Sequence, residues 1–158
     1  MSSTQGSPYV GIQIGKLALP AQIKYHGYPG VDESKQKTRS AEVYIFDEET
    51  IETLRKYEAS VQSEWPTLSL NSIFSEEEGN TCIRMKFTKL SERFSSEVDG
   101  VKSLEDLQYG DLFLSKSNVK KWQMGGSCGI VLYANIVKCV GRADTPVGRP
   151  FHSKLNWD

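Results

Sequence analysis

The most strongly strand-forming stretch of the chain reads Ile130-Val131-Leu132-Tyr133-Ala134-Asn135-Ile136-Val137, within residues 128–140. β-Branched and aromatic side chains of this kind are enriched in strands. The small residues Gly125-Gly126-Ser127 come just before it, and an extended segment precedes them, running from Leu112 to Trp122 with a kink expected at Ser117-Asn118. Two extended segments joined by a tight glycine-rich turn predict a β-hairpin.

Residues 81–89 alternate with the period of two that strands show. Ile83, Met85 and Phe87 fall on one face of this segment, and Arg84 and Lys86 on the other. Three further segments, at 9–14, 22–25 and 41–46, also read as strands, the first with Val10, Ile12 and Ile14 on one face. The expected core includes Phe87, Phe113 and Ile136.

Residues 48–64 predict the one long helix. Asp47 is a good N-cap, and two glutamates follow in the first turn, where the helix dipole favours carboxylates. An apolar stripe continues from there to Pro66, which ends the helix. The stripe contains Ile51, Leu54, either Tyr57 or Glu58, Val61 and Trp65. Residues 91–108 read as a polar loop with a helical turn around Leu104.

The order is therefore strands, one helix, then strands, without the βαβ repetition of a parallel sheet. We expect a mainly β fold with one inserted helix: an OB-fold-like antiparallel five-stranded barrel. Its 158 residues suit one domain, placed at 9–140, with a flexible N-terminus at 1–8 and a C-terminal tail at 141–158.

Composition narrows the class of protein. No apolar run approaches the roughly 18–20 residues of a membrane-spanning helix, and the first residues lack a secretory signal. The three cysteines, an odd number without paired short spacings, suit free thiols in a reducing compartment. We expect an intracellular protein, in the host cell if it is viral.

Charge is divided along the chain although the net charge is only −1. Residues 31–78 carry 5 basic and 12 acidic side chains, whereas residues 79–142 carry 10 basic and 6 acidic ones. Such a split permits a basic face on the second half of the chain. The alternative is an ordinary solvated surface on which both signs mix.

The motifs of common enzymes and metal sites are absent from the sequence, with one exception. The two histidines, His26 and His152, lack metal-ligand spacing, and no cofactor is predicted. Gly125-Gly126-Ser127-Cys128-Gly129 matches the G-x-S-x-G pattern of hydrolases, and Asp144 and His152 follow in the order of the triad. That nucleophile needs a strand–turn–helix, whereas a strand follows here, so we predict that the protein is not an enzyme.

The second half of the chain interleaves cations with aromatic rings. Single-stranded nucleic acids need cations near their phosphates and flat faces for their bases. The candidates for phosphate contact are Arg84, Lys86, Lys116, Lys120 and Lys121, and those for base stacking are Tyr44, Trp122 and Tyr133. Tyr25, Tyr28 and Phe46 are further aromatic candidates. The structural alternative is that Trp122 packs at the core or rim and that the lysines only solvate the surface.

The order of elements resembles the OB-fold single-stranded DNA-binding proteins of tailed phages. The detailed likeness covers residues 109–140, with Tyr109-Gly110-Asp111-Leu112, the pair Lys121-Trp122, a small-residue turn and a long apolar strand. The resemblance implies a non-catalytic protein that coats single-stranded DNA in replication, recombination or repair, with little sequence preference, as a monomer or homodimer.

In that family an acidic tail commonly recruits replication or recombination proteins. Here residues 141–158 hold three basic and two acidic side chains, although Trp157 and Asp158 keep an aromatic ring beside a carboxylate. Recruitment through Trp157 and Asp158 therefore stands beside a tail that packs on the barrel or is disordered. The alternative function is a protein-interaction or virion structural module on a small β-barrel.

Overall fold

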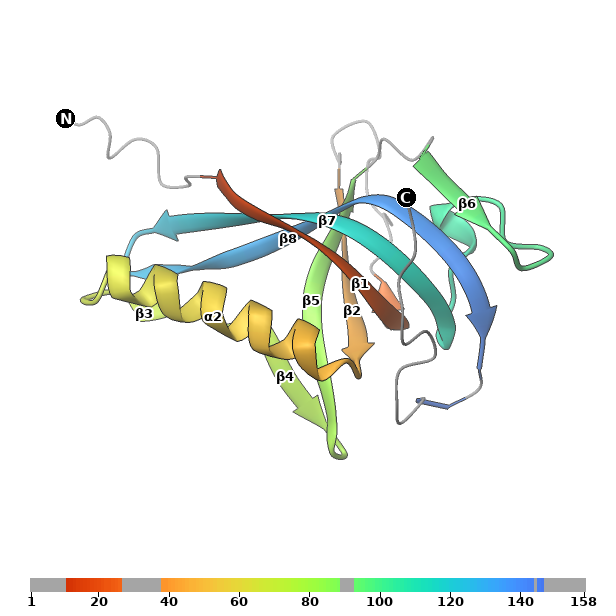
Figure 1. The fold of residues 1–158 in the computed structure, drawn as a ribbon, viewed down its shortest axis with the longest axis horizontal. Helices are drawn as coiled ribbons and strands as arrows, with labels where there is room; N and C mark the ends of the chain where they lie inside the picture. The colour runs from red at the N-terminus through yellow and green to blue at the C-terminus, as the bar shows by residue number, and fades with distance from the viewer. Residues whose placement is uncertain (1–10, 27–37, 89–92, 144, 147–158) are drawn as a thin grey trace.

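The computed structural model describes residues 11–26, 38–88, 93–143 and 145–146. Its elements, shown in Figure 1, are β1 (Ile12–His26), β2 (Thr38–Ile45), α2 (Glu48–Glu64), β3 (Ser69–Leu70), β4 (Phe74–Glu77), β5 (Asn80–Thr88), β6 (Phe94–Ser96), the 3₁₀ turn η2 (Leu104–Asp106), β7 (Asp111–Met124) and β8 (Ser127–Arg142). Within these residues the fold is mainly β with one α-helix, as the sequence predicts.

Five strands close into a barrel in the order β8-β7-β1-β2-β5, with β5 pairing back onto β8. The predicted OB-fold-like barrel is thus confirmed. One detail differs, because the closing pair, in which Lys86 lies opposite Tyr133, is parallel while the other four pairs are antiparallel. A closed ring with an odd number of strands cannot be antiparallel throughout, so at least one parallel pair is unavoidable.

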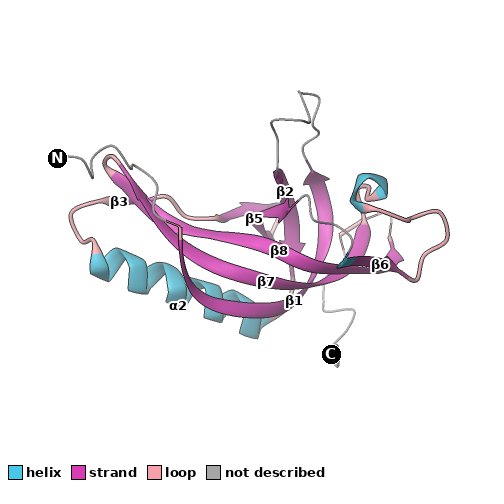
Figure 2. Cartoon of the chain, turned by 90° about the horizontal axis from the view of Figure 1, so that it is seen from above, coloured by secondary structure: helices cyan, strands magenta, loops and turns pink. Residues whose placement is uncertain are grey.

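The hairpin of β7 and β8 forms the longest part of the barrel, and its strands continue beyond it as a curved arm (Figure 2). β7 is continuous, and the expected kink appears as a register shift between Lys116 and Ser117. At this bulge Lys116 pairs with Ile136 but Ser117 pairs with Ala134, which leaves Asn135 as the extra residue. The prediction of a core position for Ile136 is wrong, because the bulge changes the alternation and leaves Ile136 half-buried on the outer face.

The core fills the barrel with the inward residues of its strands. Ile83, Met85 and Phe87 of β5 are at most 1% exposed, as their alternation predicts. Phe87 meets Phe113 of β7 edge to face, with ring centroids 5.7 Å apart. Burying each of these large side chains contributes about 1.5–3 kcal/mol, so the inner faces of β5 and β7 are tied together strongly.

α2 begins and ends where the sequence predicts. The Asp47 carboxylate accepts a hydrogen bond from the Thr50 amide at 3.2 Å, and Leu54, Glu58 and Val61 are buried toward the strands. Tyr57 lies against β1 so closely that any side chain at Gly15 would collide with its ring. Among the described residues no helix is long and apolar enough to cross a membrane.

Other segments differ from the sequence reading. β1 is one strand rather than two, and its first residues run past the barrel, which leaves Ile12 51% exposed. The polar region at 91–108 contains the expected turn, η2, and also the short strand β6, which pairs with β8. β3 and β4 were not predicted, because strands of two and four residues carry no clear alternation.

Candidate nucleic-acid interface

The outer face of β5, β8 and β7 carries most of the predicted contact residues. Alternation along β7 places Lys116, Asn118, Lys120 and Trp122 on this face, while Val119 faces the core. Across the strands, Lys86 pairs with Tyr133, Tyr133 with Asn118, and Asn118 with Lys16 of β1. The closed barrel therefore aligns a row of basic and aromatic side chains drawn from four strands.

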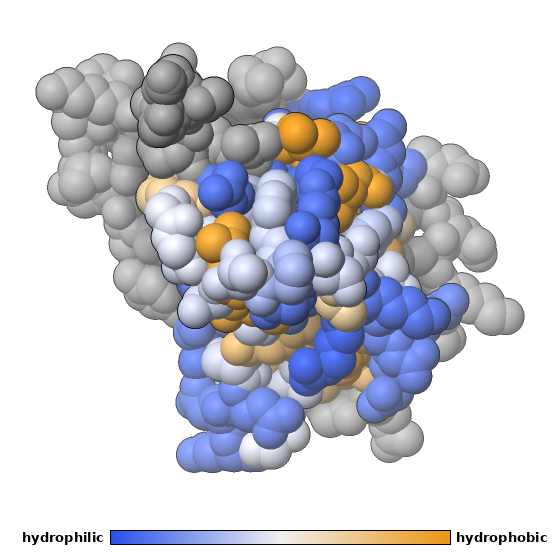
Figure 3. Space-filling view, turned by 90° about the vertical axis from the view of Figure 1, so that its left-hand side faces the viewer, coloured by the Kyte–Doolittle hydropathy of each residue, from blue (hydrophilic) through white to orange (hydrophobic). Residues whose placement is uncertain are grey.

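A groove of about 390 Å³ lies on this face, between β5 and the hairpin arm. The described residues that line it include two cations and no carboxylate; they are Ser40, Asn71, Ile73, Arg84, Met85, Lys86, Trp122, Met124, Ile130 and Val131. Figure 3 views the end of the molecule with the hairpin tip and shows apolar patches between hydrophilic ones. A groove with cations on one wall and apolar surface on the other suits a chain of phosphates and flat bases.

Trp122 is half-buried at the rim of this groove. Its indole lies against Gly129 of β8, and its Nε1 donates a hydrogen bond to the Ile130 carbonyl at 3.3 Å. The ring is thus fixed in orientation while still lining the groove. Trp122 therefore packs at the rim, as the structural alternative for this residue has it, and its ring also lines the groove.

Arg84 is positioned by the loop between β3 and β4. Its guanidinium donates to the Ser72 carbonyl and, at 3.4 Å, to the Asn71 side-chain oxygen. The loop is in turn held by Glu58 of α2, a buried carboxylate that accepts hydrogen bonds from the Ile73 amide at 2.7 Å and the Ser72 hydroxyl at 2.9 Å. The helix therefore supports one wall of the groove.

Lys120 and Tyr133 form a second basic and aromatic pair beside the groove. The Lys120 ammonium lies 5.2 Å from the centre of the Tyr133 ring, within the range of a cation–π interaction. Tyr133 is half-buried and adjoins Lys86 across the parallel pair. Tyr133 therefore lies on the outer face of β8, opposite in direction to the buried Leu132.

Two predicted residues lie elsewhere. Lys121 points away from its neighbours Lys120 and Trp122 because adjacent strand residues face opposite sides. It pairs with Glu64 of α2, at 2.7 Å, and sits over the Trp65 ring. The structure thus separates it from the groove.

Tyr44 of β2 is also not available on the outer face that carries the groove. It is only 3% exposed, and it contacts Phe46 and Tyr109 with ring centroids 6.2 and 6.5 Å away. Burial, followed by a hydrogen bond with Tyr109, raises the pKa of Tyr44 to about 12. A ring this enclosed offers no open face for a base, so the assignment of Tyr44 as a stacking platform is corrected. For the further candidates, Tyr28 and the side chain of Tyr25 lie outside the described part of the structure.

Lys116 lies on the outer face but lines a separate hollow of about 290 Å³. Lys16 and Arg93 line the same hollow and were not among the predicted residues. The alternation along β1 places Lys16 on the outer face. Only the pairing of β1 with β7 shows which residues lie beside it. Arg93 lies in the segment 91–108, which the sequence predicts to be a polar loop, so no strand pattern pointed to it.

Acidic residues lie next to the groove without lining it, and Glu42 of β2 is the register partner of Arg84. Lys24 of β1 forms ion pairs with Glu42 of β2 and Glu77 of β4. These bonds, first to Glu77 and then to Glu42, raise the pKa of the Lys24 ammonium above its usual value. The charge split seen in the sequence is therefore partly spatial, since the described residues lining the basic groove include no carboxylate.

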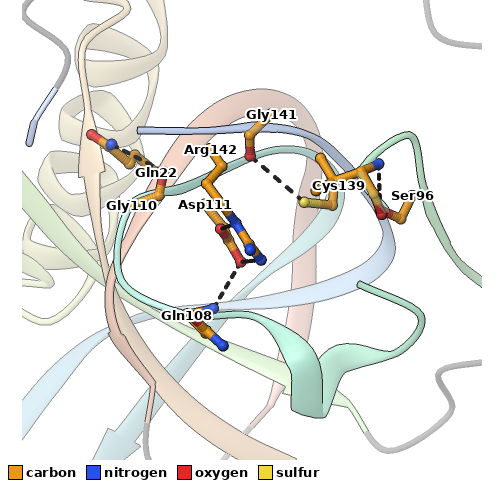
Figure 4. Close-up of polar contacts among 9 residues, drawn as sticks. Gln22, Ser96, Gln108, Gly110, Asp111, Cys139, Gly141 and Arg142 are labelled. Atoms are coloured by element: carbon orange, nitrogen blue, oxygen red, sulfur yellow. Dashed lines mark hydrogen bonds and ion pairs between the residues drawn. The ribbon is translucent and has the colours of Figure 1, made fainter. Parts of the chain in front are cut away.

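A buried carboxylate fastens the end of the hairpin far from its turn (Figure 4). Asp111 accepts hydrogen bonds from Arg142 Nε at 2.6 Å and from the Gln108 amide at 2.8 Å. The pairing raises the pKa of the Arg142 guanidinium. Gln22 donates to the carbonyls of Gly110 and Thr145, so Thr145 is held against the barrel.

The three cysteines are free and buried, and burial raises the pKa of each thiol. Ser127 lies at the tight turn of an antiparallel hairpin, not at a strand–turn–helix, while Asp144 and His152 fall outside the described residues. Residues 1–8, Trp157 and Asp158 also fall outside them. Within the described ranges, no group of three or more His, Cys, Asp and Glu side chains is placed to hold a metal ion.

The class of fold is an OB-fold-like barrel with one helix inserted between its second and third strands. Among solved structures, the chain is similar to gp2.5, a single-stranded DNA-binding protein encoded by bacteriophage T7. The match has a TM-score of 0.56 and 11% sequence identity, and it covers 82% of this chain and 93% of that chain. At this identity the likeness establishes the fold alone. No protein-family model and no curated protein sequence matches the chain.

Proposed function

We propose that this protein binds single-stranded DNA along the outer face of β5, β8 and β7. The observation that carries the proposal is the groove that brings Arg84 and Lys86 of β5 together with Trp122 of the hairpin. In OB folds, oligonucleotides bind across the second and third strands and the loop joining the last two. β2, β5 and the β7–β8 turn occupy those places here.

In this proposal the cations neutralise phosphates, while Trp122 and Tyr133 stack on bases. Base stacking contributes about 1–3 kcal/mol per base and tolerates any sequence. Little sequence preference is therefore expected, as for a protein that coats single strands in replication, recombination or repair. The similarity of fold to a phage single-stranded DNA-binding protein supports this role. Such binding requires no catalysis.

Fluorescence-anisotropy titration with labelled oligo-dT, its duplex and oligo-rU tests the proposal across salt concentrations. Three neutralising cations, Arg84, Lys86 and Lys120, contribute about −2 to the slope of log K against log salt for single strands. Preference for oligo-dT over duplex, with such a slope, is the expected result. Equal binding of oligo-rU would extend the proposal to RNA, whose 2′-hydroxyl the groove would then ignore.

Flat titrations with all three nucleic acids at low salt would contradict the proposal. The protein-interaction or virion module would then become the leading function. Lys121→Ala is the charge-matched control for Lys120→Ala, because it removes one cation that lies outside the groove.

A further inference from the structure

A second hollow continues the outer face away from the groove. It is formed where β1, β7 and β8 lie side by side, and Arg93 borders it just before β6 pairs with β8. Its volume is about 290 Å³, and it is lined by Lys16, Leu17, Ala18, Arg93, Lys116, Ser117, Asn118, Asn135 and Ile136.

Local structure explains why this surface is hollow. Lys116 pairs with Ala18 of β1, and the small side chain of Ala18 leaves space on the outer face at this point. The bulge beside Lys116 turns both Asn135 and Ile136 toward the hollow instead of sending one of them inward. Bulges commonly redirect side chains next to functional sites.

The chemistry of the hollow suits phosphate groups more than bases. Three of its nine lining residues are cations, two are asparagines that can donate hydrogen bonds, and none of these described residues is acidic or aromatic. Without an aromatic face it cannot stack bases as the groove can. Cations and amide donors without carboxylates are the usual setting for backbone phosphates.

A row of paired residues on the outer face connects the hollow with the groove. Asn118 lines the hollow and pairs directly with Tyr133, which adjoins Lys86 of the groove. From Trp122 to Lys116 along β7 the distance is about 20 Å, taking a strand rise of about 3.3 Å per residue. One extended strand of nucleic acid can therefore cross both.

We infer that the hollow of Lys16, Arg93 and Lys116 binds the phosphodiester backbone of the same DNA strand where that strand leaves the groove. This inference rests on the proposed function and extends it. The interface has two parts, an aromatic groove that holds bases and a basic hollow that holds only backbone. Binding should then depend on strand length.

The test compares the wild-type protein with Lys16→Ala/Arg93→Ala, using oligo-dT of about 4 and about 16 nucleotides, the limits of OB-fold site sizes. Both substituted side chains are exposed, so the variant is expected to fold, which circular dichroism checks. The control Lys56→Ala/Lys102→Ala removes two exposed cations from outside both the groove and the hollow. The salt dependence of binding is measured for each of the three proteins with each of the two oligonucleotides.

For the longer strand, losing two phosphate contacts should reduce the magnitude of the salt slope by about 1.4. The shorter strand and the control variant should show no such change. If the double variant matches the control on the longer strand while the wild type binds it, the inference is wrong and the proposed function stands. An equal loss on both strands would also overturn the inference. If the wild type binds neither strand, the proposed function itself fails.

Discussion

Replacing Gly129 by alanine should disturb the groove although no cation and no aromatic residue is itself substituted. A Cβ atom at Gly129 would lie 2.8 Å from the Asn71 carbonyl oxygen and 3.1 Å from Cζ2 of Trp122. Contacts under 3.0 Å to backbone cannot persist, so the β3–β4 loop and the indole must both move. Both form walls of the groove. Gly126→Ala is a matched control, because a Cβ there meets no atom within 4 Å.

The magnitudes follow from overpacking and from lost stacking. Overpacking costs about 1–3 kcal/mol of stability, which leaves a domain of typical stability folded. Displacing the indole removes up to one stacked base, about 1–3 kcal/mol, so the oligo-dT affinity should fall about 5- to 150-fold. Anisotropy titration measures the affinity, and urea denaturation measures the stability. Gly126→Ala should change neither.

A double-mutant cycle separates the indole from the loop. If Gly129→Ala acts through Trp122, its effect on affinity should largely disappear in a Trp122→Ala background. A folded Gly129→Ala protein that binds oligo-dT with wild-type affinity would refute the reasoning that Trp122 forms part of the interface.

Three further predictions test other contacts. Lys121→Ala should leave the oligo-dT salt slope unchanged, whereas Lys120→Ala should lower its magnitude by about 0.7 in anisotropy titrations; the same loss in both would contradict their opposite orientation. Glu58→Ala orphans the Ile73 amide, which should lower the free energy of unfolding in urea by about 1–3 kcal/mol, with a smaller loss for Glu58→Gln. Tyr44, with a pKa near 12 when folded and about 10 when unfolded, contributes stability below pH 10 that is lost as the pH rises toward 12. Tyr44→Phe should remove that decline in denaturation measured at pH 9 to 11.5, and an unchanged decline would show that Tyr44 is not its source.

The local sequence pattern predicts the orientation of a helix or strand correctly where one of its sides is buried. The stripe that includes Leu54 and Val61 sets the core face of α2, and the alternation from Ile83 to Phe87 sets the inner face of β5. The same alternation places Arg84 and Lys86 together on the outside. Glycines and β-branched residues likewise predict the β7–β8 hairpin, because turn and strand preferences are local.

The sequence could not determine which side of a strand faces the helix or where alternation breaks. Lys121 and Lys120 look equivalent in the sequence, yet one pairs with α2 and the other with Tyr133. Ile136 looks like a core residue until the bulge beside Lys116 changes its direction. Each outcome depends on pairing with a distant segment.

By itself, the sequence determined the barrel class, the single long helix and the group of cations and aromatic rings in the second half of the chain. These follow from short-range periodicity, from residue types and from the order of the elements along the chain. Only the tertiary structure decided that Lys86, Tyr133, Asn118 and Lys16 form one row, that Glu58 supports the groove, and that Tyr44 is enclosed. The physical reason is that strand register and barrel closure join residues far apart in the chain, and no local preference specifies those distances.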